Sequence, residues 1–149
     1  MKTSSSAGAI PNGSVEYAYQ YASIRRLNLP DASGLQTPIG SEFLNKFIAI
    51  LEKHLADPDL GVAQLSRLML VSRAQLNRKI HASSGETPVR LLTMLRLEKA
   101  CSLLVQTDEQ VMEIAIGVGF RDARYFTRCF TRHYGISPRQ YRFRARLER

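Results

Sequence analysis

Apolar residues recur every three or four positions through most of the chain after residue 40, which is the spacing of one buried face of an α-helix. Ser41, Ser72, Thr87 and Asp122 precede such runs, and their side-chain oxygens suit them to act as helix N-caps. Pro88 follows Thr87 at a first helical position. The pattern predicts helices over residues 41–56, 60–70, 73–81 and 88–106, then one opened by Asp108, one capped by Asp122 and one starting at Ser137-Pro138.

The first forty residues differ from the rest, because they are rich in Ser, Gly, Pro and Asn and lack helical periodicity. We expect residues 1–40 to form a flexible linker or tail, which would suit a domain cut from a longer protein. Tyr17, Tyr19 and Tyr21 alternate as in a strand. A lone strand has no partner, so we expect no stable strand there.

The helix expected after Asp122 has two different faces when its residues are placed at 100° intervals. One face carries arginines, and the other carries residues suited to packing. The arginines are Arg121, Arg124, Arg128 and Arg132, and the packing residues are Ala123, Phe126, Phe130 and Tyr134. A merely solvated face usually mixes both signs of charge, so this face favours a cationic binding surface.

The charge of the whole chain supports that interpretation. The 149 residues allow one compact domain or two small ones, and the net charge is +8. Residues 121–149 contain nine basic and two acidic residues, and so contribute +7. A cationic field localised in this way suggests binding to nucleic acid, or second to an anionic membrane.

Other classes of protein find little support in the sequence. The chain has no stretch of 18 apolar residues and no apolar run after Lys2, so we expect neither a membrane span nor a signal peptide. Cys101 and Cys129 lack paired spacing, which predicts free thiols in a reducing cytoplasm. Without a phosphate-binding glycine loop or a nucleophile elbow, we expect no enzyme and no cofactor. The three histidines, His54, His81 and His133, lack metal-ligand spacing.

An internal repeat appears when the sequence is shifted by fifty residues. The superposed pairs are Leu76 with Phe126, Arg78 with Arg128, Ile80 with Phe130, Gly85 with Gly135, Thr87 with Ser137, Pro88 with Pro138 and Leu91 with Tyr141. Each copy reads as a helix, a tight turn and a second helix. Two copies are too few for a solenoid, and the turn spacing indicates helix-turn-helix units.

These residues resemble the DNA-binding domain of the AraC/XylS family of bacterial transcription regulators. The resemblance is carried by Ile114-Ala115, Gly119-Phe120, Tyr125-Phe126, Phe130, Gly135, Ser137-Pro138 and Tyr141-Arg142, and by Arg96-Leu97, Ala100 and Leu103-Leu104 in the middle helix. It covers about two thirds of the chain, from Phe43 to Arg142.

The resemblance implies an all-α fold of seven helices over residues 41–149. Two helix-turn-helix units, at about residues 41–86 and 108–147, would be joined by a linker helix at 88–106. Such a helix would be about 28 Å long at about 1.5 Å per residue. Successive major-groove faces lie about 34 Å apart, so one chain would read an asymmetric duplex site with two recognition helices in adjacent major grooves.

The resemblance also assigns candidate DNA contacts, since the first turns of a recognition helix enter the groove. The base-contacting candidates are Arg73, Ala74, Asn77, Arg78, Ala123, Arg124, Thr127 and Arg128. Arginine suits guanine, asparagine suits adenine, and alanine or threonine suits the thymine methyl. The phosphate-contacting candidates are Ser72, Lys79, Arg121 and Arg132, for which a plain cap or a solvated charge is the alternative. Five further arginines, Arg139, Arg142, Arg144, Arg146 and Arg149, would add general attraction, although Arg142 belongs to the signature and has a structural alternative.

One position departs from the repeat. Leu70 stands at the first turn where Gly119 stands at the second, and a leucine in the left-handed region costs about 1 kcal/mol or more. We therefore expect the first turn to be built differently, with the second unit dominating DNA binding.

Several alternatives stay open at this point. The best rival is a helical module that docks an acidic protein partner through its basic face, in place of DNA. The DNA-repair methyltransferases that carry a similar module need four cysteines for zinc, and this chain has two. The domain suits either a small autonomous regulator or the output domain of a longer protein. In the second case receiver and histidine kinase modules, and RNA polymerase, are candidate partners.

Overall fold

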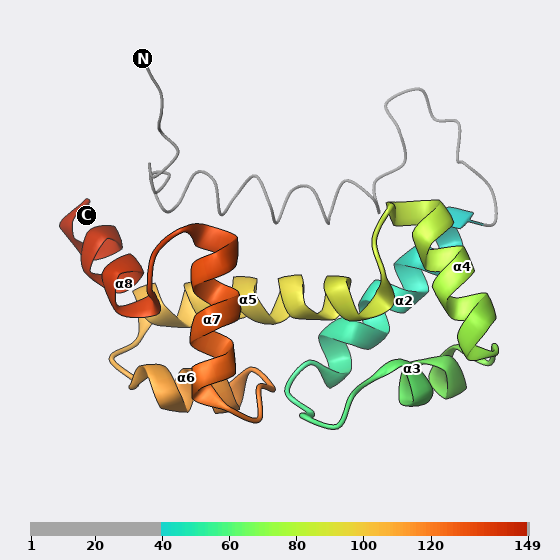
Figure 1. Cartoon of the computed structure of the whole chain (residues 1–149), viewed down its shortest axis with the longest axis horizontal. Coiled ribbons are helices and arrows are strands. Elements are labelled where there is room, and N and C mark those ends of the chain that lie inside the picture. Colours follow the sequence, from blue (N-terminus) through green and yellow to red (C-terminus); the bar gives the residue numbers. More distant parts are fainter. Residues whose placement is uncertain (1–39, 149) are drawn as a thin grey trace, which may run out of the picture. The chain divides into compact units, whose positions relative to one another are not determined.

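The structure, a computed structural model, describes residues 40–148, and these residues form helices without any strand (Figure 1). The helices are α2 Gly40–His54, α3 Val62–Met69, α4 Arg73–Ser84, α5 Pro88–Gln106, α6 Val111–Gly117, α7 Ala123–Tyr134 and α8 Pro138–Leu147. The prediction of an all-α fold with seven helices is thereby confirmed for this part of the chain. The expected linker at residues 1–40 and the alternating tyrosines lie, apart from Gly40, outside the described residues.

Most predicted helix starts are confirmed, and two are wrong. Thr87 caps α5, since its Oγ1 accepts a hydrogen bond from the Arg90 N–H at 3.1 Å. Ser41 lies inside α2, which begins one residue earlier at Gly40. The sixth helix begins at Val111 and not at Asp108.

The corrected start of α6 has a local cause. The Gln110 N–H donates to the Glu113 carboxylate at 2.9 Å, and a residue three positions into a helix that reaches back to the cap in this way fixes the helix start. Asp108 instead lies in the connection, where its carboxylate forms an ion pair with Arg146 at 2.8 Å.

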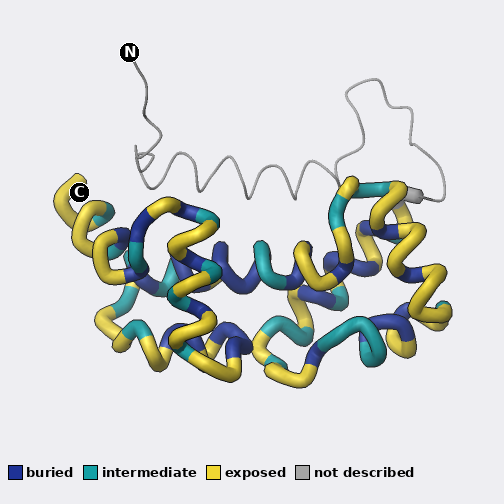
Figure 2. Tube along the Cα trace, in the orientation of Figure 1, coloured by how far each residue is buried: buried dark blue, intermediate teal, exposed yellow. Residues whose placement is uncertain are grey.

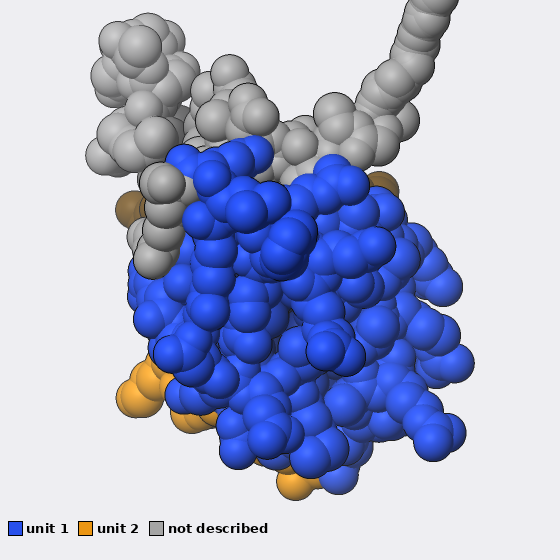
Figure 3. Space-filling model, turned by 90° about the vertical axis from the view of Figure 1, so that its left-hand side faces the viewer, with its two compact units in different colours: residues 1–21, 96–149 blue, residues 22–95 orange. Residues whose placement is uncertain are grey.

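The chain divides into two compact units, coloured separately in Figure 3. Of the described residues, 40–95 form the N-terminal unit and 96–148 form the C-terminal unit. The long helix α5 contributes its first turns to the N-terminal unit and the remainder to the C-terminal unit.

The core of the N-terminal unit is mainly aliphatic. Helix α2 packs against α3 and α4, and α3 packs against α4. The burial pattern in Figure 2 follows the helical periodicity. The fully buried large side chains are Leu44, Phe47, Ile48, Leu51, Leu65, Leu76, Ile80 and Leu91.

The core of the C-terminal unit contains a cluster of five aromatic rings among smaller side chains. The Phe130 ring lies at its centre, with its centroid 5.7 Å from Phe126, 4.6 Å from Tyr134 and 5.5 Å from Tyr141. Phe126 also packs edge-on against Phe120, at 5.1 Å. Tilted and edge-to-face pairs of this kind stabilise a core beyond the area that they bury.

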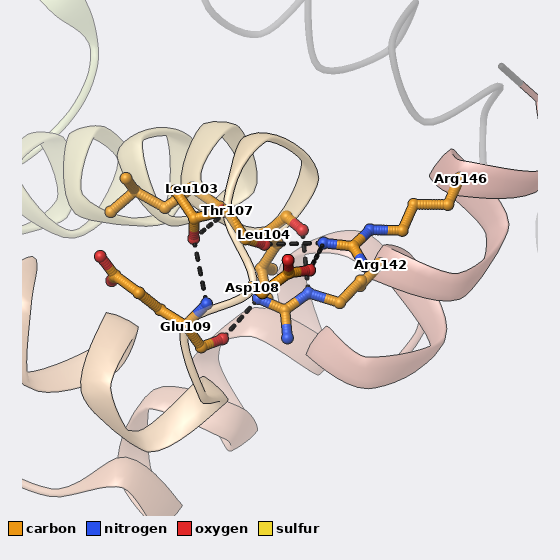
Figure 4. Close-up of polar contacts among 7 residues, drawn as sticks. All are labelled: Leu103, Leu104, Thr107, Asp108, Glu109, Arg142 and Arg146. Atoms are coloured by element: carbon orange, nitrogen blue, oxygen red, sulfur yellow. Dashed lines mark hydrogen bonds and ion pairs between the residues drawn. The ribbon is translucent and has the colours of Figure 1, made fainter.

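Two arginines of α8 hold the end of α5 (Figure 4). The Arg142 side chain donates to the carbonyls of Leu104 at 2.9 Å and Glu109 at 2.6 Å. Arg146 donates to the carbonyl of Thr107 at 2.7 Å. Leu104 lies in the last turn of α5, where carbonyls lack partners within the helix, so Arg142 completes that turn. The bonds to Thr107 and Glu109 hold the connection that follows the helix.

Candidate nucleic-acid interface

The turn between α3 and α4 is built around Leu70, which adopts a left-handed conformation with φ 59° and ψ 40°. The Leu70 N–H donates to the Arg67 carbonyl at 3.1 Å, and the Val71 N–H donates to the Ser66 carbonyl at 3.0 Å. These two bonds form a Schellman motif, which satisfies carbonyls at the end of α3.

The turn between α6 and α7 has the same hydrogen bonds. Gly119 has φ 107°, and its N–H donates to the Ile116 carbonyl at 3.1 Å. The Phe120 N–H donates to the Ala115 carbonyl at 3.0 Å. The expectation that the first turn is built differently because of Leu70 is therefore wrong. Two backbone hydrogen bonds hold the turn, and they offset a strain of about 1 kcal/mol.

Both recognition helices begin at the predicted caps. Ser72 Oγ accepts from the Gln75 N–H at 3.1 Å, and the Gln75 side chain accepts from the Ser72 N–H at 3.1 Å. Asp122 Oδ1 accepts from the Arg124 N–H at 2.9 Å. Capping is thus confirmed for Ser72 and Asp122, and the Ser72 hydroxyl, also predicted to contact phosphate, is used within its own helix start.

The outer face of α4 carries all four of its predicted base-contacting residues. Arg73, Ala74, Asn77 and Arg78 are exposed, whereas Leu76 and Ile80 on the other face are buried in the core. The helix therefore presents two guanidinium groups, one amide and one methyl group together, on a surface that the core does not use.

Helix α7 presents its predicted set in a similar way. Arg124 and Arg128 are exposed, and Ala123 and Thr127 are half-buried beside them. Phe126 and Phe130 point into the core and are fully buried. The division into an arginine face and a packing face, predicted at 100° per residue, is confirmed.

Tyr125 also belongs to this surface, although it was not among the predicted contacts. Its ring is half exposed, and the Arg128 guanidinium carbon lies 5.8 Å from the ring centroid. Its pKa is raised, first by a side-chain hydrogen bond with Cys129. The spacing of three residues between Tyr125 and Arg128, which places them on one helix face, was the available signal.

The residues predicted to contact phosphate surround these faces. Arg121 and Arg132 are exposed at the start and end of α7. The ammonium group of Lys79 lies 4.9 Å from the centroid of the Phe43 ring, which steadies a side chain that is itself exposed.

The arginines of α8 fall into two groups. Arg142 and Arg146 form hydrogen bonds within the fold, near the end of α5, which confirms the structural alternative for Arg142 and gives the exposed Arg146 a structural contact as well. Arg139 and Arg144 are exposed. Arg149 lies outside the described residues.

Residues 40–148 contain neither a candidate metal site nor a candidate membrane span. No three His, Cys, Asp or Glu side chains in that range gather where they would hold a metal ion. None of its helices is long and apolar enough to cross a membrane.

Comparison with known proteins agrees with this geometry. Residues 65–144 match the family model of a helix-turn-helix domain. The transcriptional activator RhaS of Escherichia fergusonii is 41% identical over 99 residues, which cover 66% of this chain and 35% of RhaS. The chain thus spans about a third of the length of the first curated relatives that it matches.

Two solved structures show the same fold. The C-terminal domain of the two-component response regulator yesN from Fusobacterium nucleatum is 33% identical, with a TM-score of 0.64 over 66% of this chain and 95% of that domain. The DNA-binding domain of AdpA, solved in complex with a target DNA, is 30% identical, with a TM-score of 0.67 over 70% of this chain and 94% of that domain.

Proposed function

Because this chain belongs to the AraC/XylS-type helix-turn-helix family of transcription regulators, we propose that it reads duplex DNA sequence-specifically with α4 and α7 as its two recognition helices. The observation that carries the proposal is the repeated element. Two turns with the same hydrogen bonds each lead into a capped helix whose outer face is polar and cationic.

Each helix presents the groups that direct readout of base pairs requires. Arg73 and Arg78 on α4, and Arg124 and Arg128 on α7, supply planar forks that can donate to both major-groove acceptors of guanine. Asn77 has the amide that pairs with adenine, and Thr127 has a methyl group suited to thymine. We assign base contacts to these residues and to Ala74 and Ala123.

The surrounding basic residues would fix the register of the protein on the duplex. Arg121 and Arg132 are exposed near the start and end of α7, and Lys79 is exposed midway along α4, so each could contact the phosphates that border the groove. Ser72 is exposed at the start of α4 and would add a phosphate contact by donating its hydroxyl hydrogen, since the cap uses only the hydroxyl oxygen as an acceptor. These contacts raise affinity for any sequence and make it depend on salt.

We further propose that the chain is the output part of a longer regulator. The support is its similarity to the C-terminal domain of a response regulator, and its span of about a third of its curated relatives. A receiver and a histidine kinase module would then supply the signal, and RNA polymerase would receive the effect.

Selection of bound sequences from a pool of random duplexes tests the DNA-binding proposal. We expect one asymmetric consensus with two blocks of preferred bases about 10 base pairs apart, one block for each recognition helix. Affinity for the selected duplex should fall steeply as salt rises. If that duplex bound no better than a random one at physiological salt, sequence-specific reading by this chain would be rejected.

A further inference from the structure

A hollow of about 710 Å³ lies in the C-terminal unit, between the start of α6 and one side of α8. Its lining comes from residues 108–112 and 139–147, and none of it comes from α7. We call this hollow the α6–α8 groove. Because no residue of α7 lines it, the groove lies off the face of α7 that we assign to base contacts.

The α6–α8 groove has an apolar part, which we call its floor and which is exposed. Met112, Phe143 and Leu147 line it, and they are 59%, 65% and 69% exposed. Large apolar side chains gathered in the open, rimmed by polar residues, mark surfaces that another molecule covers. Because these apolar side chains are more than half exposed, the groove suits a segment that lies across it better than an enclosed small molecule.

The charged part of the same lining, which we call its rim, is mainly cationic. Arg139, Arg142 and Arg146 line it, against a single carboxylate from Asp108. Arg146 pairs with that carboxylate, and Arg142 is held by two backbone carbonyls. The positive charge beside the apolar floor is thus fixed in place, and Arg139 remains exposed.

We propose that the α6–α8 groove binds an acidic amphipathic segment of a partner protein. Its apolar residues would cover Met112, Phe143 and Leu147, and its carboxylates would face the arginine rim. This is an interaction surface additional to DNA binding, because a phosphate backbone offers nothing to the apolar floor.

Charge complementarity selects this occupant over the others. A second copy of the chain carries a net charge of +8 and would be repelled by the rim. Residues 1–39 of the chain itself contain Lys2, Arg25 and Arg26 against Glu16 and Asp31, which gives +3 − 2 = +1. Neither supplies the negative charge that the rim would bind.

Selection from a displayed library of random peptides tests the proposal. The peptides are about 16 residues long, or about four helical turns, and the target is the full chain. We expect enrichment of peptides that combine Asp or Glu with Leu, Phe or Met at helical spacing. Enrichment without acidic residues, or no enrichment at all, would overturn the proposal.

Matched variants then locate the selected peptides. Met112→Ala and Phe143→Ala should each weaken binding about tenfold, as loss of a central interface side chain does. Ile116→Ala is the control, because Ile116 is 51% exposed on the same helix as Met112 but does not line the groove. Equal losses from Met112→Ala and Ile116→Ala would contradict the assignment.

The charge of the rim is tested in the same way. Arg139→Glu should weaken peptide binding about tenfold, whereas Arg144→Glu, on α8 but outside the lining, should change it little. Competition by duplex DNA would place the peptide on the α7 face, and a dimer dissolved by Phe143→Ala would identify a second copy as the occupant. Either result would overturn the proposal, and an unchanged circular dichroism spectrum of each variant guards against misfolding.

Discussion

At the turn before α4 the left-handed residue is Leu70, and at the turn before α7 it is Gly119, yet the hydrogen bonds that close the two turns join corresponding atoms. A leucine is disfavoured in that conformation and a glycine is not. Leu70 is 84% exposed, so its side chain is not placed there for packing. The turn before α4 thus keeps the same hydrogen bonds as the turn before α7, although a leucine disfavours the left-handed conformation that the turn requires.

The same two units differ in how their recognition helices are anchored. At equivalent positions in the repeat, α4 buries Leu76 and Ile80, whereas α7 buries Phe126 and Phe130. The face directed into the core thus changes from aliphatic to aromatic while the outer face keeps its polar character. In this repeated helix, the residues that pack into the core can therefore change without a change in the polar character of the exposed face.

Charge separates the units less than the sequence suggests. Helix α4 carries Arg73, Arg78 and Lys79, and helix α7 carries Arg124, Arg128 and Arg132, so each has three lysine or arginine residues. The excess in the C-terminal unit comes largely from the arginines of α8. The expected dominance of the second unit therefore loses the reason that the turn supplied, and it stays a prediction that rests on the greater positive charge of that unit.

The largest effect should come from the aromatic anchor. Phe130→Ala should lower the free energy of unfolding by about 3–5 kcal/mol, because the lost ring leaves a cavity among three other rings. Urea unfolding followed by circular dichroism measures this. Phe143→Ala is the control, since its ring is 65% exposed and should cost less than about 0.5 kcal/mol. Similar losses from the two variants would remove Phe130 as an anchor.

The next largest effect should come from the arginines of the two recognition helices, α4 and α7. Arg78→Ala and Arg128→Ala should each weaken binding to the selected duplex by about 1–3 kcal/mol, and each should relax preference at a different base position. Titrations at a fixed salt concentration measure both. Arg121→Ala is the control, because loss of a phosphate contact should weaken all sequences alike. If only one of the two variants lost affinity, the other unit would not read DNA.

A smaller effect concerns the turns. Leu70→Gly should raise the free energy of unfolding by about 0.5–1 kcal/mol by relieving the left-handed strain. Gly119→Ala should lower it by about 1 kcal/mol or more, because its φ of 107° disfavours any side chain. Thermal unfolding of both variants measures the contrast. Changes of the same sign would show that the turns differ in a way their hydrogen bonds do not reveal.

The smallest effect concerns Tyr125. Tyr125→Leu should weaken binding by about 0.5–1 kcal/mol, because the ring no longer holds the Arg128 guanidinium in one orientation. Duplexes with single base changes should show the loss only at the position that Arg128 reads. Tyr125→Phe keeps the ring and should bind like the original chain. An equal loss from both substitutions would assign the effect to the hydroxyl and its bond to Cys129.

Features that depend on neighbours in the sequence were predicted well. Ser72, Thr87 and Asp122 were identified as caps because a cap acts within three residues. Ser41 was one error among them, since α2 begins at Gly40, and Asp108 was the other. Its side chain is also a good cap, but Gln110 has Glu113 three residues later, and that reciprocal pair fixed the helix start.

Features that depend on distant residues were not predictable in the same way. The α6–α8 groove needs Met112 and Phe143 to meet, and no local pattern links them. The left-handed conformation of Leu70 is a local feature, but it was also unexpected. Leucine disfavours that conformation, and only the two hydrogen bonds of the closed turn offset the strain. The individual base contacts stay predictions, since their assignment rests on the position of each residue in its helix.

The arginine contacts at the end of α5 have a consequence for how the chain folds. Helix α5 has no basic residue in its last turn, and the Leu104 carbonyl in that turn is bound by Arg142, 38 residues further along. Contacts of such long sequence separation close late, after the intervening loop entropy has been lost. The far end of α5 is therefore completed only when α8 docks, so a ribosome must have synthesised Arg142 before the Leu104 carbonyl gains this partner.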